Sequence, residues 1–291
     1  MPMATVRPRR SVLYMPGSNA RALEKAKTLA ADTLILDLED SVAPDAKDAA
    51  RALVAQNIAA GGYGHRELIV RVNGLDTPWG HADLVDAATM GADGVLLPKV
   101  SDVELVRRAV DILDGAGGTP GLPVWCMMET ARATFRADQI ADHPRVDCLV
   151  MGTSDLAKEL HAAHTPMRLP MITSLGLCLL AARAAGISIL DGVSLDLDDE
   201  RGFRDSCIQG AELGFDGKTL IHPKQLAAAN EAFAPSQEAV ERAHKMIVAF
   251  EEARAAGKGV VVVDGKLVEN LHVAEAKRLV ALADAIAAAA A

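Results

Sequence analysis

The chain repeats one local pattern, a short aliphatic run that ends abruptly in charged residues. The clearest example is the segment 33–42, where Thr-Leu-Ile-Leu leads into Asp37, Glu39 and Asp40. Later runs of the same kind end near Arg71, Glu129 and Asp155. Strands of a parallel sheet are buried on both faces, and a parallel barrel carries its active site at the carboxyl ends of its strands. The pattern therefore predicts a parallel α/β barrel with acidic and basic groups at its mouth.

About eight strand–helix units follow one another. The expected strands cover residues 11–15, the aliphatic part of 33–42, 68–72, 94–98, 124–128, 148–151, 187–191 and 215–220. Ser18 or Asn19 is expected to cap a helix over 20–30, and Ser101 a helix after the fourth strand. With 291 residues, the chain fits one TIM (β/α)8 barrel of roughly 250 residues plus an appendage.

The pattern changes after the eighth strand, which divides the chain into a barrel over residues 1–234 and an appendage over 235–291. Ser236 is expected to cap a long helix that ends before Gly257. Residues 260–268 read as a β-hairpin with an Asp264-Gly265 turn, and an alanine-rich helix ends the chain. We expect this C-terminal helix–hairpin–helix appendage to pack on a neighbouring subunit or to cover a site.

Charge and composition exclude several classes of partner. The net charge is -9 and aromatic residues make up only 3%, so neither a basic nor a base-stacking surface for nucleic acid is expected. No apolar run reaches the ~18 residues of a membrane span, and the N-terminus lacks the apolar core of a signal peptide. Four separate cysteines inside apolar segments indicate reduced core residues. We expect a cytoplasmic protein.

Glu129 and Asp155 follow consecutive strands, so their carboxylates can converge at the mouth of the barrel. Two carboxylates without nearby His or Cys suit Mg²⁺, which takes one or two protein carboxylates and keeps other positions for water and substrate. The alternative is that each acid caps the helix after its strand. Two acids at consecutive exits, with Asp37 and Glu39 nearby, favour the metal site.

Each of three further side chains has two possible roles. Arg71 lies in an aliphatic strand, where an unpaired guanidinium is costly; it either pairs with Asp37 and Glu39 or binds a substrate carboxylate. Lys99 is an anion contact or a solvated lysine. His222 is a base or, as we favour, a structural histidine.

A tight turn at Pro16-Gly17-Ser18 precedes a helix N-terminus and suggests phosphate binding. Arg9, Arg10 and Lys25 are close in sequence. An ordinary turn with a cap also explains the segment. The basic residues and the turn together predict a site for an anionic, phosphate-bearing substrate.

Seven motifs in order resemble those of the citrate lyase β-subunit-like family, which is part of the HpcH/HpaI aldolase superfamily and includes the malyl-CoA and citramalyl-CoA lyases. They are Arg-Ser-Val-Leu-Tyr-Met-Pro-Gly-Ser over 10–18, Leu-Asp-Leu-Glu-Asp-Ser-Val over 36–42, Arg-Val-Asn-Gly over 71–74, Pro-Lys-Val over 98–100, Met-Glu-Thr-Ala over 128–131, Gly-Phe-Asp-Gly-Lys over 214–218 and Ile-His-Pro over 221–223. The resemblance covers nearly the whole chain. It implies a Mg²⁺-dependent TIM barrel that acts on CoA thioesters as a homotrimer or hexamer.

The resemblance also implies roles for individual residues. The metal carboxylates are Glu129 and Asp155, and Arg71 binds the carboxylate of a small oxoacid. The acidic motif with Asp37 and Glu39 surrounds that arginine and the metal waters. The segment Gly152-Thr153-Ser154 is expected to contact substrate. The basic residues and turn named above are expected to bind CoA.

Two departures from the family pattern bear on the reaction. Ala133 replaces a frequent glycine beside the metal, and Glu269 stands where many members carry a catalytic aspartate in the hairpin. The motifs look most like the branch of (3S)-malyl-CoA thioesterases. Glutamate is one methylene longer than aspartate, a reach that suits activation of water near a thioester and disturbs enolate chemistry. We therefore favour hydrolysis; carbon–carbon cleavage with Glu269 as the base and a non-catalytic CoA-ester-binding protein are the alternatives.

Overall fold

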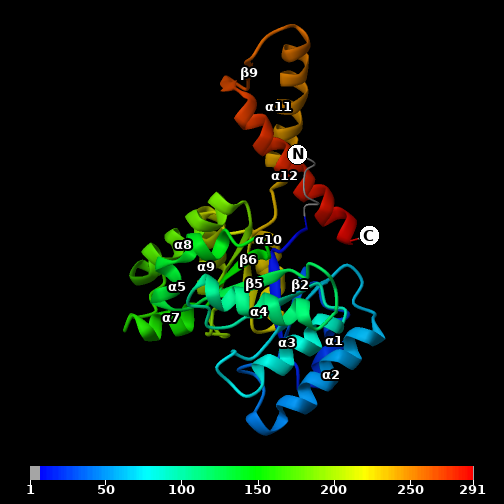
Figure 1. The fold of residues 1–291 in the computed structure, drawn as a ribbon. Coiled ribbons are helices and arrows are strands. Elements are labelled where there is room, and N and C mark those ends of the chain that lie inside the picture. Colours follow the sequence, from blue (N-terminus) through cyan, green and yellow to red (C-terminus); the bar gives the residue numbers. More distant parts are fainter. Residues whose placement is uncertain (1–6, 291) are drawn as a thin grey trace. The chain divides into compact units, whose positions relative to one another are not determined.

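The computed structural model describes residues 7–290. One of its two compact units, residues 9–233, is an eight-stranded barrel (Figure 1). The strands are β1 Ser11–Pro16, β2 Thr33–Asp37, β3 Glu67–Arg71, β4 Gly94–Leu97, β5 Val124–Met128, β6 Val146–Met151, β7 Ser188–Asp191 and β8 Gly217–Leu220. Each strand pairs in parallel with the next, and β8 pairs with β1, which closes the barrel. The predicted TIM barrel is confirmed.

Helices surround the strands. They are α1 Ala20–Ala26, α2 Lys47–Ala60, α3 Gly80–Thr89, α4 Val103–Gly115, α5 Ala131–Phe135, α6 Ala137–Ala141, α7 Thr153–Glu159, α8 Ile172–Ala185, α9 Glu200–Leu213 and α10 Leu226–Ala232, with 3-10 turns η1 Pro44–Ala46, η2 Leu169–Met171 and η3 Pro223–Gln225. In α4, Val106, Ala109, Val110 and Leu113 are buried at spacings of three and four, so one stripe of the helix faces the sheet.

Two helix boundaries differ from the predictions. The first helix ends at Ala26 rather than Ala30, because the next N–H groups bond three residues back in tighter 3-10 turns. Asn19 caps this helix. The fourth helix is capped by Asp102, whose Oδ1 accepts from the Leu105 N–H at 3.1 Å, and not by Ser101. A carboxylate one residue closer to the helix takes the capping position.

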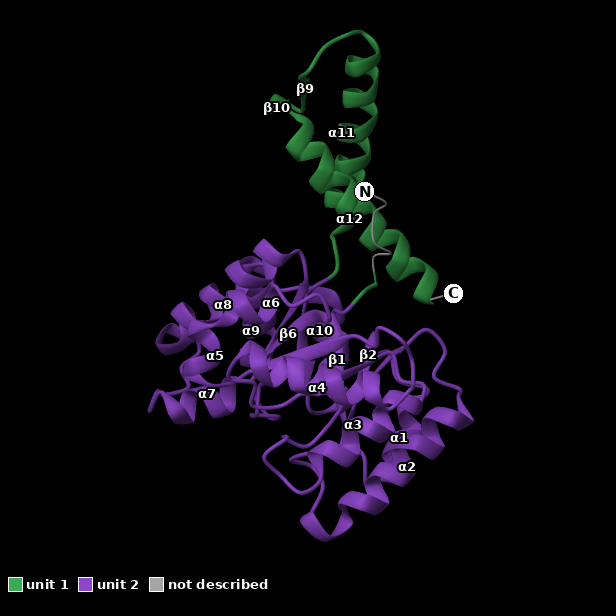
Figure 2. Cartoon of the chain, in the orientation of Figure 1, with its two compact units in different colours: residues 1–8, 234–291 green, residues 9–233 purple. Residues whose placement is uncertain are grey.

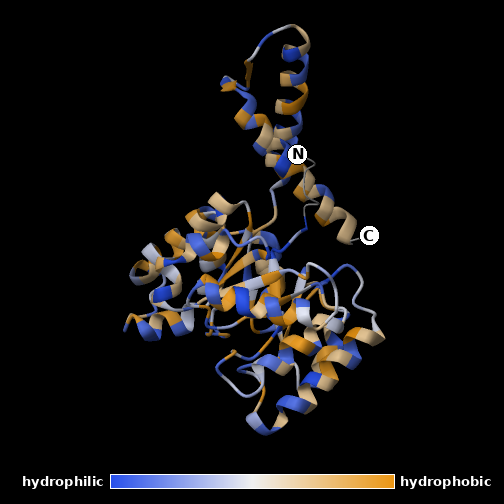
Figure 3. Ribbon diagram, in the orientation of Figure 1, coloured by the Kyte–Doolittle hydropathy of each residue, from blue (hydrophilic) through white to orange (hydrophobic). Residues whose placement is uncertain are grey.

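The core has two layers on either side of the strands. Inside the barrel lie Val12, Ile35, Ile69, Leu96, Trp125, Met127, Cys148, Val150 and Leu190, with Tyr14 packed against them. A larger apolar layer fills the space between strands and helices. Figure 3 shows hydrophobic residues concentrated on the strands. This filling makes the barrel a packed scaffold that leaves its polar groups for the ends.

Arg9 closes the end of the barrel where the strands begin. Its guanidinium bonds Glu67 in a fork at 2.7 and 2.8 Å and Asp147 at 2.6 Å. It also donates to Ser188 at 2.9 Å and stacks 4.7 Å from the Trp125 ring centre. These partners come from three strands and from the inner core. Arg9 therefore ties the strand starts together.

Replacement of Arg9 by methionine should lower the free energy of unfolding by about 2 kcal/mol, because the buried Glu67 carboxylate loses the two hydrogen bonds from the Arg9 guanidinium. The charged residues that follow β2 to β5 lie at the other end of the strands, so their arrangement should not change. Urea unfolding followed by circular dichroism measures the first effect, and Asp147→Asn is a milder control because this carboxylate is half-exposed. An unchanged free energy of unfolding in the methionine variant would contradict the structural role.

The other compact unit, drawn green in Figure 2, contains residues 234–290 together with Arg7 and Pro8 among the described residues. Its elements are α11 Gln237–Ala255, β9 Val261–Val263, β10 Lys266–Val268 and α12 Asn270–Ala290. Ser236 caps α11, as predicted. The two strands pair antiparallel, and the positive φ angles of Asp264 and Gly265, 48° and 75°, suit the predicted hairpin turn.

Two expectations about chain type can be compared with the fold. All four cysteines are free and buried, which confirms the prediction of reduced core thiols. In the described residues, no helix combines the length and apolar character that a membrane crossing requires.

Candidate active site

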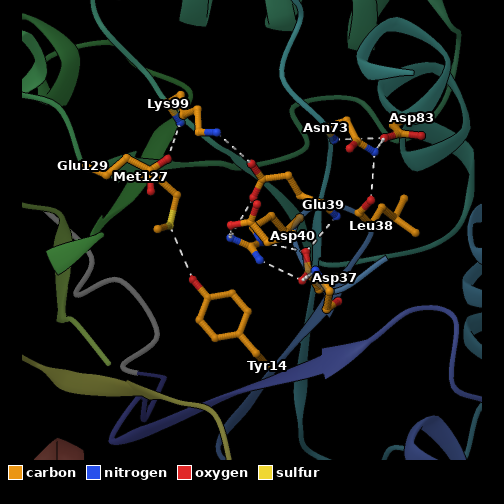
Figure 4. Close-up of polar contacts among 12 residues, drawn as sticks. Tyr14, Asp37, Leu38, Glu39, Asp40, Asn73, Asp83, Lys99, Met127 and Glu129 are labelled. Atoms are coloured by element: carbon orange, nitrogen blue, oxygen red, sulfur yellow. Dashed lines mark hydrogen bonds and ion pairs between the residues drawn. The ribbon is translucent and has the colours of Figure 1, made fainter. Parts of the chain in front are cut away.

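The carboxyl ends of β2 to β5 bring charged side chains together at one end of the barrel (Figure 4). Asp37 ends β2, Arg71 ends β3, and Lys99 and Glu129 follow β4 and β5. In a parallel barrel these positions meet at the same rim. The grouping is the one that the strand exits predict.

Arg71 is held at its edges by the acidic segment after β2. Its Nε and Nη2 atoms donate to the two Asp37 carboxylate oxygens at 2.7 Å each. Its Nη1 atom lies 2.8 Å from Glu39 Oε2 and 3.7 Å from Asp40 Oδ2. Burial by itself would raise the pKa of Asp37, but Arg71 overcomes this effect and the pKa is lowered. The predicted pairing of Arg71 is confirmed, and N–H groups remain on Nη1 and Nη2 for a further acceptor.

Side chains of Lys47 and Asn73 hold the backbone of the acidic segment, residues 37–40. Lys47 Nζ donates to the carbonyl oxygens of Leu38 and Glu39 at 2.9 and 2.7 Å. Asn73 Nδ2 donates to the same Leu38 carbonyl at 2.9 Å and to the buried Asp83 at 2.6 Å. Figure 4 shows Asn73 and Asp83 on the far side of this segment from Glu129. The anchors fix the acids without occupying their carboxylates.

Glu129 has one oxygen fixed and one directed at the next strand. Its Oε1 accepts from the Lys99 backbone N–H at 2.5 Å. Its Oε2 lies 2.6 Å from the point where a Cβ of residue 152 would be, so only glycine fits at Gly152. Burial raises the pKa of Glu129 to about 7, and the carboxylates of Glu39 and Asp155 add to the rise. Glu129 and Asp155 therefore lie close enough for their charges to interact.

The capping alternative for the two acids is not what the structure shows. Thr130 caps α5 by accepting from the Ala133 N–H at 3.0 Å. Gly152 is the N-cap of α7, and Asp155 lies in the first turn. Neither acid is used as a helix cap, and both remain available to a ligand.

The mouth contains more negative than positive charge. Its carboxylates are Asp37, Glu39, Asp40, Glu129 and Asp155, and its cations are Arg71 and Lys99. Such an excess in a partly buried place is stabilised by a bound cation. Among the described residues no group of three His, Cys, Asp or Glu side chains could hold a metal, but Mg²⁺ needs only one or two carboxylates. Glu129 and Asp155 fit that requirement.

The residues after β6 divide into buried and accessible side chains. Thr153 is buried, and its side chain lies against Gly192 after β7. Ser154 and Asp155 are half-buried. Of the three residues predicted to contact substrate, Gly152 and Ser154 are therefore better placed than the Thr153 side chain.

The six residues predicted to bind CoA lie at opposite ends of β1. Pro16, Gly17, Ser18 and Lys25 lie at the mouth or on α1, and Ser18 and Lys25 are exposed. Arg9 and Arg10 precede the strand. Arg10 binds Asp32 in a fork at 2.7 and 2.8 Å, and Arg9 is paired as described above. The structure does not bring these two arginines to the mouth, and their partners already engage both guanidinium groups.

Sequence reasoning missed Tyr14, which lies on the inner face of β1. Its ring centre is 4.8 Å from Arg71 Cζ, and its hydroxyl donates to Met127 Sδ at 3.4 Å. Strand alternation was the available signal, because Val12 and Tyr14 must face the same way. The structure also places Lys99 and His222, for which the sequence allows two roles each. The ammonium of Lys99 lies 3.7 Å from Glu39, and His222 caps η3, the structural role that the sequence favours.

A separate buried ion cluster lies between β7, β8 and α9. Asp191 bonds Lys218 at 2.8 Å and Arg168 at 2.6 Å, and Gly210 of α9 makes room for the Asp191 carboxylate. Burial would raise the pKa of Asp191, but the two cations lower it. The cluster joins the chain before α8 to the last strands.

Asp191 should make stability depend on pH in a defined window. Its pKa is lower in the folded chain than the value of about 3.9 in an unfolded chain. The ion pairs therefore stabilise the fold above about pH 4, and this contribution is lost as the pH falls toward the folded pKa. We expect the stability difference between the wild type and Asp191→Asn to shrink below pH 4 in denaturant titrations. A difference that stays constant from pH 6 to pH 3 would contradict this assignment.

Comparison with known proteins places the chain among similar sequences. The model of the family described as HpcH/HpaI aldolase/citrate lyase matches residues 10–223. A (3S)-malyl-CoA thioesterase of Cereibacter sphaeroides is 56% identical over 281 residues, covering 97% of this chain and 96% of the relative. An L-malyl-CoA/β-methylmalyl-CoA lyase of the same organism is 35% identical over 312 residues, covering 99% and 98%.

A solved structure is similar over a comparable range. Protein CitE from Mycobacterium tuberculosis, in complex with magnesium, acetoacetate and coenzyme A, is 27% identical with a TM-score of 0.74. The match covers 97% of this chain and 100% of the CitE chain. The family match and the barrel fold are thus consistent with each other.

Proposed function

This chain belongs to the HpcH/HpaI aldolase/citrate lyase family, and from that premise we propose that it is a Mg²⁺-dependent enzyme that hydrolyses (3S)-malyl-CoA to malate and CoA. The observation that carries the proposal is the 56% identity, over nearly the full length of both chains, to an enzyme named (3S)-malyl-CoA thioesterase. The named lyase is 35% identical over a similar range. The higher identity favours hydrolysis over carbon–carbon cleavage.

Glu129 and Asp155 would hold the Mg²⁺ ion. The excess of carboxylates at the mouth and the Lys99 N–H that fixes Glu129 Oε1 support this assignment. The bound ion would supply positive charge to substrate oxygens. Magnesium in the similar CitE complex is consistent with it.

Arg71 would bind the free carboxylate of the malyl group. One N–H on Nη1 and one on Nη2, which Asp37 and Glu39 leave unused, can form a fork with two carboxylate oxygens. Asp37 and Glu39 would hold the guanidinium in place. Gly152 and Ser154 would line the same end of the substrate.

The CoA part of the substrate would lie at the exit of β1. Ser18 and Lys25 are exposed there, and the ammonium group can pair with a phosphate. Gly17 is required for a different reason, because its N–H donates to the Asp37 carbonyl at 2.8 Å and a Cβ would come within 2.6 Å of that oxygen. The turn contacts the start of the acidic segment through Gly17, and it would also position the CoA contacts.

Glu269 would act as the general base of hydrolysis. It follows β10, and its backbone N–H donates to His272 Nδ1 at 3.0 Å, which fixes the turn into α12. The carboxylate would take a proton from water as the oxygen attacks the thioester carbonyl. The carbon–sulfur bond would then break, and the protonated Glu269 would return the proton to the leaving thiolate, which gives malate and the CoA thiol. We propose that residues 235–291 bring Glu269 to a barrel mouth of the same or a neighbouring subunit.

Exposed apolar side chains support a homo-oligomer, proposed here as a trimer or hexamer. They occur in both units and include Phe135, Met167, Leu169, Leu180, Val262, Leu267 and Leu271. Large apolar side chains at a surface commonly mark a protein contact. Light scattering coupled to gel filtration would give the mass.

The second candidate function is cleavage of the carbon–carbon bond, which the named lyase relative favours. Turnover of malyl-CoA, methylmalyl-CoA and citramalyl-CoA with Mg²⁺ tests the whole proposal. We expect malyl-CoA to give the highest kcat/KM. Tight binding of all three esters without turnover would contradict enzymatic function and leave a binding protein.

A further inference from the structure

Tyr14 touches Arg71 on a side that the carboxylates leave open. Asp37 and Glu39 hold the edges of the guanidinium. The Tyr14 ring lies 4.8 Å from Arg71 Cζ, the distance of a cation–π contact. The guanidinium is thus fixed within its plane by acids and across its plane by an aromatic ring.

The Tyr14 hydroxyl contributes little to this arrangement. Its partner is the thioether sulfur of Met127, at 3.4 Å, and this sulfur is a weak acceptor. Figure 4 shows the hydroxyl pointing away from Asp37 and toward Met127. The ring is therefore the part of Tyr14 that contacts the charged site.

The ring can be a simple core filler or a support for Arg71. A filler would affect folding stability alone. A support would keep the free N–H groups of Arg71 in one plane, and that plane sets where a carboxylate can bind with two hydrogen bonds. Tyr14 is half-buried rather than fully buried, and its ring contacts Arg71 at the carboxyl end of β3.

We propose that Tyr14 is a positioning residue for substrate, whose ring holds the Arg71 guanidinium in the orientation that binds the substrate carboxylate. The inference rests on the proposed carboxylate role of Arg71. Loss of the ring lets the guanidinium tilt, and a cation–π contact of about 1.4 kcal/mol corresponds to about tenfold in affinity. Loss of the hydroxyl removes only the contact with sulfur.

Calorimetric titration with malate in the presence of Mg²⁺ tests this without requiring turnover. We expect Tyr14→Leu and Tyr14→Met to weaken malate binding about tenfold, and Tyr14→Phe to bind within about twofold of the wild type because the ring is retained. Val12→Ala, on the same inner face, is the control for packing and should lower the melting temperature without changing the affinity for malate.

The outcomes separate this inference from the proposed function. If Tyr14→Leu and Tyr14→Met bind malate as tightly as the wild type does, the positioning role alone is overturned. An equal loss in Tyr14→Phe would also overturn it, because the hydroxyl would then carry the effect. Absence of malate binding by the wild type would contradict the carboxylate role of Arg71, and the inference would fall with it. In an Arg71→Lys background, removal of the ring should have no further effect.

Discussion

Asp155→Asn and Glu129→Gln should each reduce turnover by about 10³-fold and weaken Mg²⁺ binding, because each removes one of the two carboxylates assigned to the ion. Loss of a charge stabilisation of several kcal/mol corresponds to a rate change of this order. Chelation of the wild-type enzyme with EDTA should give the same loss, and added Mg²⁺ should restore it. Titration calorimetry with Mg²⁺ measures the binding directly.

The controls for the metal prediction use charge changes elsewhere. Asp138→Asn on α6 removes an exposed carboxylate and should leave both Mg²⁺ affinity and turnover unchanged. A wild-type preparation stripped of metal that keeps full activity would contradict the assignment of Glu129 and Asp155. Normal Mg²⁺ affinity in both variants would contradict it as well.

Arg71→Met should destabilise the fold by about 3 to 5 kcal/mol, because it leaves Asp37 buried beside Glu39 without a cation. The variant should also lose the fork for the substrate carboxylate, so turnover should fall further than stability alone explains. Urea unfolding and kcat/KM measure the two effects. This prediction addresses the two roles of Arg71 that the sequence leaves open.

A double variant separates these roles. In Arg71→Met/Asp37→Asn no unpaired charge remains at that pair, so much of the lost stability should return. Activity should not return, because the guanidinium is still absent. If activity returned together with stability, Arg71 would serve only to stabilise the fold by pairing with Asp37.

The barrel could be predicted because its information is local. Each aliphatic run is a strand, and each charged exit such as Asp37 or Glu129 must lie at the same rim of a parallel barrel. The cost of burying a lone guanidinium limited Arg71 to two roles, and pairing with Asp37 and Glu39 was one of them. These residues needed no knowledge of distant contacts.

The role of Arg9 could not be predicted from its closeness in sequence to Gly17. The strand between them extends about 3.3 Å per residue, so six residues carry the chain from one end of the barrel to the other. Arg9 then meets Glu67 and Asp147, which come from distant strands. Tyr14 was missed for a related reason, since its contact with Arg71 forms only when β1 and β3 take their places in the closed barrel.

The strained backbone of Lys99 also lay beyond sequence reasoning. Its φ angle is 50°, a left-handed conformation that a lysine adopts at some energetic cost. This conformation accompanies the short contact from its N–H to Glu129. The sequence shows a lysine after a proline but not the direction of its N–H group.

In the proposed reaction the thioester is broken, and the carbon–carbon bond is not. Incubation with (3S)-malyl-CoA and Mg²⁺, with free thiol and trapped glyoxylate followed separately, tests it most directly. We predict that thiol and malate appear together and that Glu269→Gln abolishes their release. Formation of glyoxylate and acetyl-CoA without release of thiol would contradict hydrolysis of the thioester.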